Sequence, residues 1–424
     1  MKRIMRDLVA HSIGGGWGKA EPFPQGVQVA VIRGTDFPNC AIGDSDELPQ
    51  RWETERRVAS RRLVPGDIIL ESSGGSPDQP TGRTLFITHD LLESIELPAI
   101  PASFCKLMRI ERDLANPRYV YYWLQNMYRE GRTWGYQTAS TGIANFQFEY
   151  FLDTELLVLP SLEEQTSIGT ALGLLDDKIE SNHRIRNHIL DLCRLKFSML
   201  FGDLGDETPG QQIITLDKIG RIVAGGTPSK KNPDYYSPNA IAWLTPRDLS
   251  RSRNVFRQHG ELDISEEGLR KSSAQLLPEG TVLFTSRAPI GYLAIASGQT
   301  STNQGFKSIV PNGEFGTPFT YFLLESLTPK IQAHAGGSTF KEISKTGMSA
   351  IRLTEPDLQD VSTFNNYSGP LLERLASCER ESAKLSALRD VLLPELMSGR
   401  IRVRDIKHSV EDAVNHEIPE AKDV

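Results

Sequence analysis

Apolar residues recur at helical spacing in two long segments of the chain. In the first segment they step alternately by four and three residues, at Ile168, Leu172, Leu175 and Ile179. The pattern lapses near Asn182 and His183 and resumes at Ile189. A stripe of this period predicts one long helix over residues 161–202.

A second segment near the C-terminus shows nearly the same steps. Its apolar seam positions are Leu371, Leu375, Leu385 and Leu392. We therefore expect a second long helix over residues 354–403. Two pairs that resemble capping boxes, Ser161 with Glu164 and Thr354 with Asp357, predict where the helices begin.

Two apolar stripes of equal length in one chain can bury each other. We expect the helices to pair as an antiparallel coiled coil, because a lone helix with one apolar stripe is marginal in water. The alternative is that each helix packs only on its own globular block. The break at Asn182 and His183 fits either a polar layer that fixes the register of the pair or a surface kink.

Each long helix follows a block with the same order of predicted elements. The first block has strand-like runs at 27–32, 64–70 and 84–87 and a helix at 117–130. In the second block, 277–284 and 292–296 follow the same order of strands, and 318–327 parallels the helix. This order predicts two copies of one α+β module, each followed by a long helix.

The pattern sets the expected domain limits. They are 1–160 for the first module, 161–202 for the central helix, 203–353 for the second module, 354–403 for the C-terminal helix and 404–424 for a polar tail.

Composition adds little to this picture. The chain has 424 residues, 39% of them hydrophobic and 24% charged, which is ordinary for a globular protein. Its four cysteines do not cluster and are expected to be reduced and buried. No apolar stretch approaches the ~18 residues that span a membrane, so we expect a cytoplasmic protein. The net charge of −7 argues mildly against nucleic acid, but the second module has more Lys and Arg than Asp and Glu.

Several short segments of the chain match catalytic motifs only in part. Residues 232–235 and 116–119 resemble an amino-methyltransferase signature, yet each has a charged residue in place of its second proline. The glycine-rich run 14–19 lacks the spacing and the Ser or Thr of a phosphate loop. The eight histidines form no metal-binding or catalytic motif. We expect no catalytic residue and no metal site in this chain.

A binding signature remains. Basic, aromatic and polar residues gather in the loops of both modules, where cations can neutralise phosphates and polar side chains can contact base edges. The candidate DNA-binding residues are Lys19, Arg33, Arg56, Arg57, Arg61, Tyr136, Gln137, Thr227, Ser229, Lys230, Lys231, Arg247, Arg287 and Lys341.

Several motifs resemble the specificity subunits of Type I restriction–modification enzymes. Residues 12–19 with 31–36 resemble the start of one class of target recognition domain, and 225–229 with 241–244 resemble another. The helix opening at 162–165 and the helix end at 392–401 resemble the conserved regions of the family. The second helix lacks the usual Leu-x-Glu-Gln opening, which leaves its register open.

The resemblance implies a non-catalytic subunit. Its two target recognition domains would read the halves of a split site in double-stranded DNA, and its helices would act as a ruler. Two methyltransferase subunits and the restriction/translocase subunits would be its partners. No cofactor is expected in this chain, because S-adenosylmethionine, ATP and Mg²⁺ would bind to those partners.

Two other classes stay open. An enzyme of unknown type would need a pocket with convergent titratable groups. A coiled-coil scaffold that does not bind DNA would show no salt-dependent DNA binding.

Overall fold

The computed structural model describes residues 1–424 except 77, 141–142, 207–209, 253, 288, 338–340 and 406–424. The polar tail predicted at 404–424 therefore lies outside the described residues beyond position 405. The chain divides into two compact units. Unit 1 contains residues 1–184 and 381–424, and unit 2 contains residues 185–380. The predicted domain limits remain a prediction.

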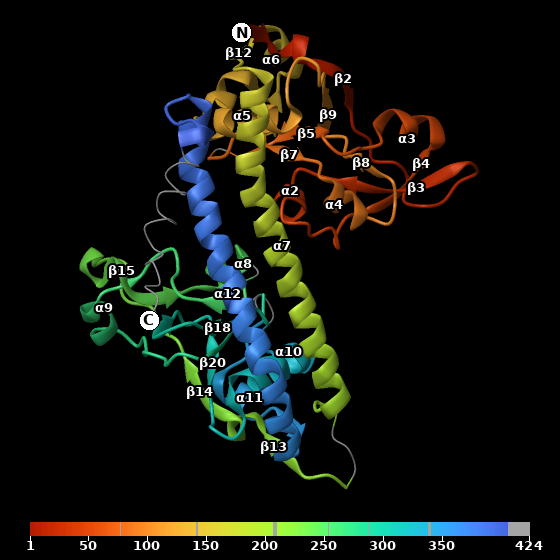
Figure 1. Cartoon of the computed structure of the whole chain (residues 1–424). Coiled ribbons are helices and arrows are strands. Elements are labelled where there is room, and N and C mark those ends of the chain that lie inside the picture. The colour runs from red at the N-terminus through yellow and green to blue at the C-terminus, as the bar shows by residue number, and fades with distance from the viewer. Residues whose placement is uncertain are drawn as a thin grey trace, which may run out of the picture. The chain divides into compact units, whose positions relative to one another are not determined.

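The sheets of unit 1 are small and mostly antiparallel (Figure 1). The largest has the order β2 (Val9–Gly14), β9 (Cys105–Ile110), β5 (Ile68–Glu71), β7 (Thr84–Phe86). A second has the order β4 (Gln50–Thr54), β3 (Gly26–Ile32), β8 (Ala99–Pro101), in which β3 and β8 are parallel. The others are β10 (Gln137–Ser140), β11 (Ile143–Phe146), β6 (Ser73–Gly74), and β1 (Lys2–Ile4) with β12 (Leu156–Val158).

Short helices cover these sheets. They are α1 (Met5–Leu8), α2 (Phe37–Cys40), α3 (Glu55–Arg61), α4 (His89–Glu93), α5 (Pro117–Arg129), η1 (Arg132–Tyr136) and α6 (Phe148–Thr154). The helix predicted at 117–130 is confirmed as α5. It begins there because the Asn116 side chain accepts hydrogen bonds from the N–H groups of Arg118 and Tyr119, and Pro117 is suited to the first turn.

Unit 2 has the same kinds of element. Its main sheet has the order β14 (Gly220–Ala224), β20 (Lys307–Pro311), β17 (Val282–Phe284), β18 (Leu293–Ala296), β16 (Phe256–Arg257). The remaining strands pair as β15 (Tyr236–Leu244) with β19 (Thr300–Thr302) and β13 (Ile213–Thr215) with β21 (Arg352–Thr354). The short helices are η2 (Leu216–Lys218), η3 (Pro233–Tyr235), α8 (Pro246–Ser250), α9 (Glu266–Arg270) and α11 (Lys345–Ser349); α10 (Gly316–His334) is longer than the predicted 318–327.

The two modules share one strand topology. The order β2-β9-β5-β7 in unit 1 corresponds to β14-β20-β17-β18 in unit 2. The parallel pair β3 and β8 corresponds to β15 and β19, and the antiparallel pair β1 and β12 to β13 and β21. The prediction of two copies of one α+β module is confirmed.

Matching turns support the same correspondence. Gly66 before β5 and Gly280 before β17 both have a positive φ, of 95° and 79°, which a residue with a Cβ adopts only with strain. The N–H of Gly66 donates to the carbonyl of Ile87 and that of Gly280 to the carbonyl of Ala296, both at 2.9 Å. The predicted turn-and-strand repeat therefore has the same hydrogen bond in each copy.

Each module leads into a helix of 40 residues, α7 (Leu162–Phe201) or α12 (Leu358–Met397). The Ser161 hydroxyl accepts from the N–H of Glu164, as predicted. The second predicted cap is wrong. Thr354 is the last residue of β21, where its hydroxyl donates to the carbonyl of Asp206, and Asp357 caps α12 instead through the N–H groups of Gln359 and Asp360.

The two long helices pack against each other in antiparallel fashion (Figure 1). In unit 1, Arg389 of α12 contacts Asp176 of α7 at 2.6 Å. Further along α7, the buried Asn182 donates to Glu381 at 2.9 Å and to Ser382 at 3.3 Å. The break in the apolar pattern is therefore a polar layer within the pair. The predicted fold class is confirmed.

The predicted seam residues do more than join the helices. Ile168 and Leu172 are buried together with Leu393 and Leu396 of α12 in the core of the first module. Leu375 is buried, and Leu371 packs against the core of the second module. Leu175, Leu385 and Leu392 are partly buried, and Ile179 is buried. Pairing of the two helices and packing of each helix on a globular block were the two alternatives. Both hold in part, because each helix packs on its partner and on the modules.

Two other expectations concern the chain as a whole. All four cysteines, Cys40, Cys105, Cys193 and Cys378, are buried free thiols. Among the described residues, no helix is both long enough and apolar enough to span a membrane.

One buried carboxylate ties α12 to the sheet of unit 2. Glu379 accepts hydrogen bonds from the N–H groups of Val255 at 2.7 Å and Phe256 at 3.0 Å. The guanidinium of Arg186, on α7, lies 3.4 Å from the same carboxylate. Burial raises the pKa of Glu379, while the two N–H donors and the nearby arginines act to lower it. The carboxylate thus joins α7, α12 and β16.

We expect Glu379→Ala to destabilise unit 2 by about 3–5 kcal/mol, because it leaves a buried arginine and two backbone donors without their acceptor. Urea unfolding followed by circular dichroism measures the change. Glu373→Ala is the control: Glu373 is exposed on the same helix, so its substitution should stay within about 0.5 kcal/mol. Equal effects of the two substitutions would contradict the anchoring role of Glu379.

Candidate nucleic-acid interface

A basic surface in unit 1 is built on α3, which lies on the side of the unit away from α7 (Figure 1). Arg56 is exposed, and no other described residue bonds to its side chain. Arg57 contacts the buried Glu53 at 3.4 Å, and Arg61 donates to the carbonyl of Gly14 at 2.9 Å. Two of the three predicted α3 arginines are therefore held in place, and the third is free to meet a ligand.

The glycine-rich run 14–18 lies against this helix because its backbone packs closely. A Cβ on Gly15 would lie 2.1 Å from the carbonyl oxygen of Ala102, and Gly18 has a φ of +68°. Beyond the run, Lys19 pairs with Trp52 through backbone hydrogen bonds and places its ammonium 4.8 Å from the Phe23 ring. The glycines thus carry Lys19 to the same surface as α3.

The sequence-based set omits a stacked pair at this surface. The guanidinium of Arg51 lies over the Trp17 ring at 4.7 Å, and Trp17 is 39% exposed. An exposed aromatic ring beside cations suits contact with a base or sugar. Both residues are among the basic and aromatic loop residues that the sequence indicates, but only the fold brings Trp17 to Arg51.

Three other predicted residues of the first module have internal partners. Arg33 forms an ion pair with Asp36 at 2.7 Å. Tyr136 donates to Glu155 at 2.6 Å, and its ring packs against Phe146 and Phe151. The Gln137 side chain accepts from the N–H of Thr81. These residues stabilise the module, and their predicted role in DNA contact stays a prediction.

In unit 2 the glycine pair before Thr227 is tightly enclosed. A Cβ on Gly225 would lie 2.0 Å from the carbonyl oxygen of Asn303, and one on Gly226 would lie 2.4 Å from Ser273 and Ala274. The Trp243 indole donates to the carbonyl of Gly226 at 2.9 Å, and the hydroxyl of Thr227 bonds to Gln304. These contacts fix the loop that carries the next predicted residues.

That loop presents exposed cations. Ser229, Lys230 and Lys231 are exposed, as is Arg247 in α8. Within the described part of the chain, no hydrogen bond or ion pair joins the side chains of Lys230, Lys231 or Arg247 to another residue. They are therefore available to an anionic ligand without losing an internal contact.

Arg287 and Lys341 differ in this respect. The guanidinium of Arg287 contacts Glu342 at 3.0 Å, and the buried Lys307 lies 3.5 Å from the same carboxylate. Burial lowers the pKa of Lys307, and Glu342 opposes that effect. Lys341 is exposed beside this group. A phosphate that contacts Arg287 would have to compete with Glu342.

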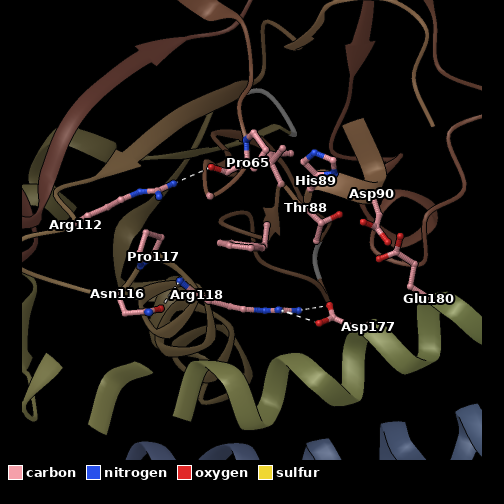
Figure 2. A pocket seen from close by; sticks show the side chains of 13 residues that line it. Pro65, Thr88, His89, Asp90, Arg112, Asn116, Pro117, Arg118, Asp177 and Glu180 are labelled. Carbon is pink, nitrogen blue, oxygen red and sulfur yellow. Dashed lines mark hydrogen bonds and ion pairs between the residues drawn. The ribbon is translucent and has the colours of Figure 1, made fainter. Parts of the chain in front are cut away.

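A cavity of unit 1 lies elsewhere, between α4, the start of α5 and α7. It has a volume of about 520 Å³ and is lined by polar and charged side chains (Figure 2). His89, Asp90 and Glu93 lie close enough together at its edge to share one metal ion. These residues were not predicted from the sequence.

Comparison with known proteins finds a family match over the second module. Residues 210–367 match the family described as Type I restriction modification DNA specificity domain. The matched segment contains the predicted residues Thr227, Lys230, Arg247 and Arg287.

Curated relatives match different parts of the chain. The Type I restriction enzyme MjaIX specificity subunit of Methanocaldococcus jannaschii is 33% identical over 176 residues, which are 40% of this chain and 40% of that protein. The HindI specificity subunit of Haemophilus influenzae is 27% identical over 195 residues, 45% of this chain and 42% of that protein. The chain thus spans less than half the length of these two relatives. The putative MjaX specificity subunit of M. jannaschii is 24% identical over 371 residues, 82% of this chain and 81% of that protein.

A solved structure shares the fold. The crystal structure of a Type I restriction–modification system S subunit from M. genitalium aligns with a TM-score of 0.58 at 14% identity, over 93% of this chain and 95% of that one. The resemblance found in the sequence is confirmed: the chain is similar to the specificity subunits of Type I restriction–modification systems, and residues 210–367 match the family model of their DNA specificity domain.

Proposed function

We propose that the chain selects the DNA target of a Type I restriction–modification enzyme by reading a two-part site. The observation that carries this proposal is the same module built twice, each copy with its own group of exposed cations. One module reads one half-site, and the paired helices keep the two readers in one chain. The similarity of the chain to the specificity subunits of two Type I restriction enzymes supports this proposal.

The cations of each module suit DNA in different ways. Lys19 and Arg56 in the first module and Lys230 and Lys231 in the second are exposed, flexible cations, which suit contact with phosphates. Arg247 lies on α8, whose start is capped by Thr245. The Asp248 carboxylate of the same helix accepts a hydrogen bond from the N–H of Thr245 at 2.7 Å. Because α8 is fixed in this way, Arg247 is the best-positioned base reader of the second module.

The helices also provide docking surfaces for methyltransferase subunits. Leu192, Leu195 and Met199 recur at helical spacing on α7 and are 48%, 60% and 72% exposed. In unit 1, Leu174 of α7 and Leu388 and Val391 of α12 are likewise exposed. Apolar side chains grouped on a helix face mark a protein interface. Exposed apolar side chains thus occur on the long helices in both units, as the binding of two copies of the same partner would need.

Methyl transfer and cleavage belong to the partner subunits in this proposal. S-adenosylmethionine, ATP and Mg²⁺ bind there, and this chain contributes the choice of DNA sequence. The restriction/translocase subunit joins the assembly of specificity and methyltransferase subunits.

The DNA prediction concerns Arg247 and Lys230. In the complex with its methyltransferase, Arg247→Ala should weaken binding by about 1–3 kcal/mol at one half-site only, because a base contact is lost. Lys230→Ala should weaken binding to all sequences alike and reduce the slope of log K against log salt by about one, because a phosphate contact is lost. Fluorescence anisotropy at several salt concentrations, with probes altered in one half-site at a time, measures both.

Lys218→Ala is the matched control. Lys218 is an exposed cation in η2, which contacts α11, and Figure 1 shows α11 and α8 in different parts of unit 2. Its substitution should leave affinity and salt slope unchanged. Salt-independent binding, or no DNA binding by the assembled complex, would instead favour the scaffold without DNA-binding activity.

The docking prediction concerns the patch on α7 in unit 2. The double substitution Leu192→Glu with Leu195→Glu should remove one of two bound methyltransferase copies, because each leucine contributes about 1.5–3 kcal/mol when buried. Native mass spectrometry of the co-expressed proteins counts the copies. Leu262→Glu, at a residue 50% exposed outside the helices, is the control. Two methyltransferase copies on the double variant would exclude this patch.

A further inference from the structure

His89 and Asp90 line one side of the cavity in unit 1. Together with Glu93 they belong to α4, and the ligand atoms of the three residues lie within 4.8 Å of one another. His89 and Glu93 are 3.5 Å apart, and both side chains are largely exposed. Such clusters are common on protein surfaces and do not by themselves indicate a metal site. The further observation comes from the residue that faces the cluster across the cavity.

That facing residue is Glu180 of α7. Glu180 is only 6% exposed, yet its Oε1 atom has no hydrogen-bond partner among the residues that the structure describes. Figure 2 shows its carboxylate turned toward that of Asp90 at the edge of the cavity. A buried carboxylate oxygen without a partner costs free energy that a bound cation would recover.

The backbone around Glu180 holds it in this position. Gly43, with a φ of +76°, lies so close that a Cβ there would be 2.9 Å from Glu180 Oε1. Gly43 therefore packs against one side of the Glu180 side chain, where a larger residue would clash with the carboxylate.

The neighbouring charges leave an excess of negative charge. Arg184 contacts Asp90 at 2.8 Å, and Arg118 forms an ion pair with Asp177. Each arginine thus neutralises one carboxylate, whereas Glu180 has no ion pair among the described residues and Glu93 faces only the imidazole of His89. Burial raises the pKa of Glu180; Arg184 opposes the shift, and Asp90 and Asp177 add to it.

We propose that Glu180, Asp90, His89 and Glu93 bind one divalent metal ion. The ligand set combines carboxylate oxygens with one imidazole nitrogen, which suits Mn²⁺ or Zn²⁺ better than the all-oxygen preference of Mg²⁺ and Ca²⁺. The exposed side chains of His89 and Glu93 can turn to the ion, whereas Glu180 is already fixed.

The ion would join two elements distant in the sequence. Asp90 belongs to the first module and Glu180 to the long helix α7. Metal binding would therefore stabilise the attachment of the module to its helix, and it would raise the unfolding temperature of unit 1. This role is independent of DNA binding and of the methyltransferase.

Isothermal titration of the full chain with MnCl₂, and separately with ZnCl₂, tests the site. Mn²⁺ electron paramagnetic resonance counts bound ions. We expect one saturable ion per chain and an affinity at least tenfold lower in Glu180→Gln. Glu96→Gln, which removes an exposed carboxylate three residues beyond Glu93, should leave binding unchanged.

Two results would overturn the proposal. One is the absence of saturable binding up to about 1 mM of either metal. Any affinity would then be weaker than a Kd of about 1 mM, which corresponds to a binding free energy of about −4.1 kcal/mol. The other is equal binding by wild type and Glu180→Gln, since the ion would then sit on the surface cluster alone. Should Glu180→Gln not fold, His89→Gln, at an exposed position, takes its place with the same expected tenfold loss.

Discussion

The antiparallel packing of α7 on α12 is the contact on which the rest of the structure depends. Each helix contributes one half to unit 1 and the other half to unit 2. In both units the helix halves are part of the module core: Ile168 and Leu172 with Leu393 in unit 1, and Phe197 with Phe364 in unit 2. The helices are therefore not a separate stalk. They complete two hydrophobic cores that neither module completes alone.

Polar residues set the register of this packing. Apolar contacts along a helix tolerate sliding by one turn, whereas Asn182 with Ser382 and Arg186 with Glu379 have their partners at one alignment only. A shift of one turn along the helix pair would therefore separate these buried polar groups from their partners.

The sequence predicts the repeated parts of this structure well, because a period of 3.6 residues or a turn glycine is a local signal. The start of α12 was misplaced because Thr354 and Asp357 are spaced like a cap, while the pairing of β21 with β13 depends on residues far away. The candidate site shows the same limit. The partner of Arg33 is three residues away and visible in the sequence, but those of Arg287 and Tyr136 lie at Glu342 and Glu155. Glu180 and α4 are brought together only by the fold.

The division of the helices has a consequence for synthesis on the ribosome. Unit 2 is one continuous stretch, residues 185–380, and can close as soon as it has emerged. The first module is made before unit 2 but lacks Leu393 and Leu396 until α12 has followed. It must therefore wait, with part of its apolar surface uncovered, for a segment that is made after unit 2. A ribosome that stops before α12 is complete leaves this module as the species most prone to aggregate or to be degraded.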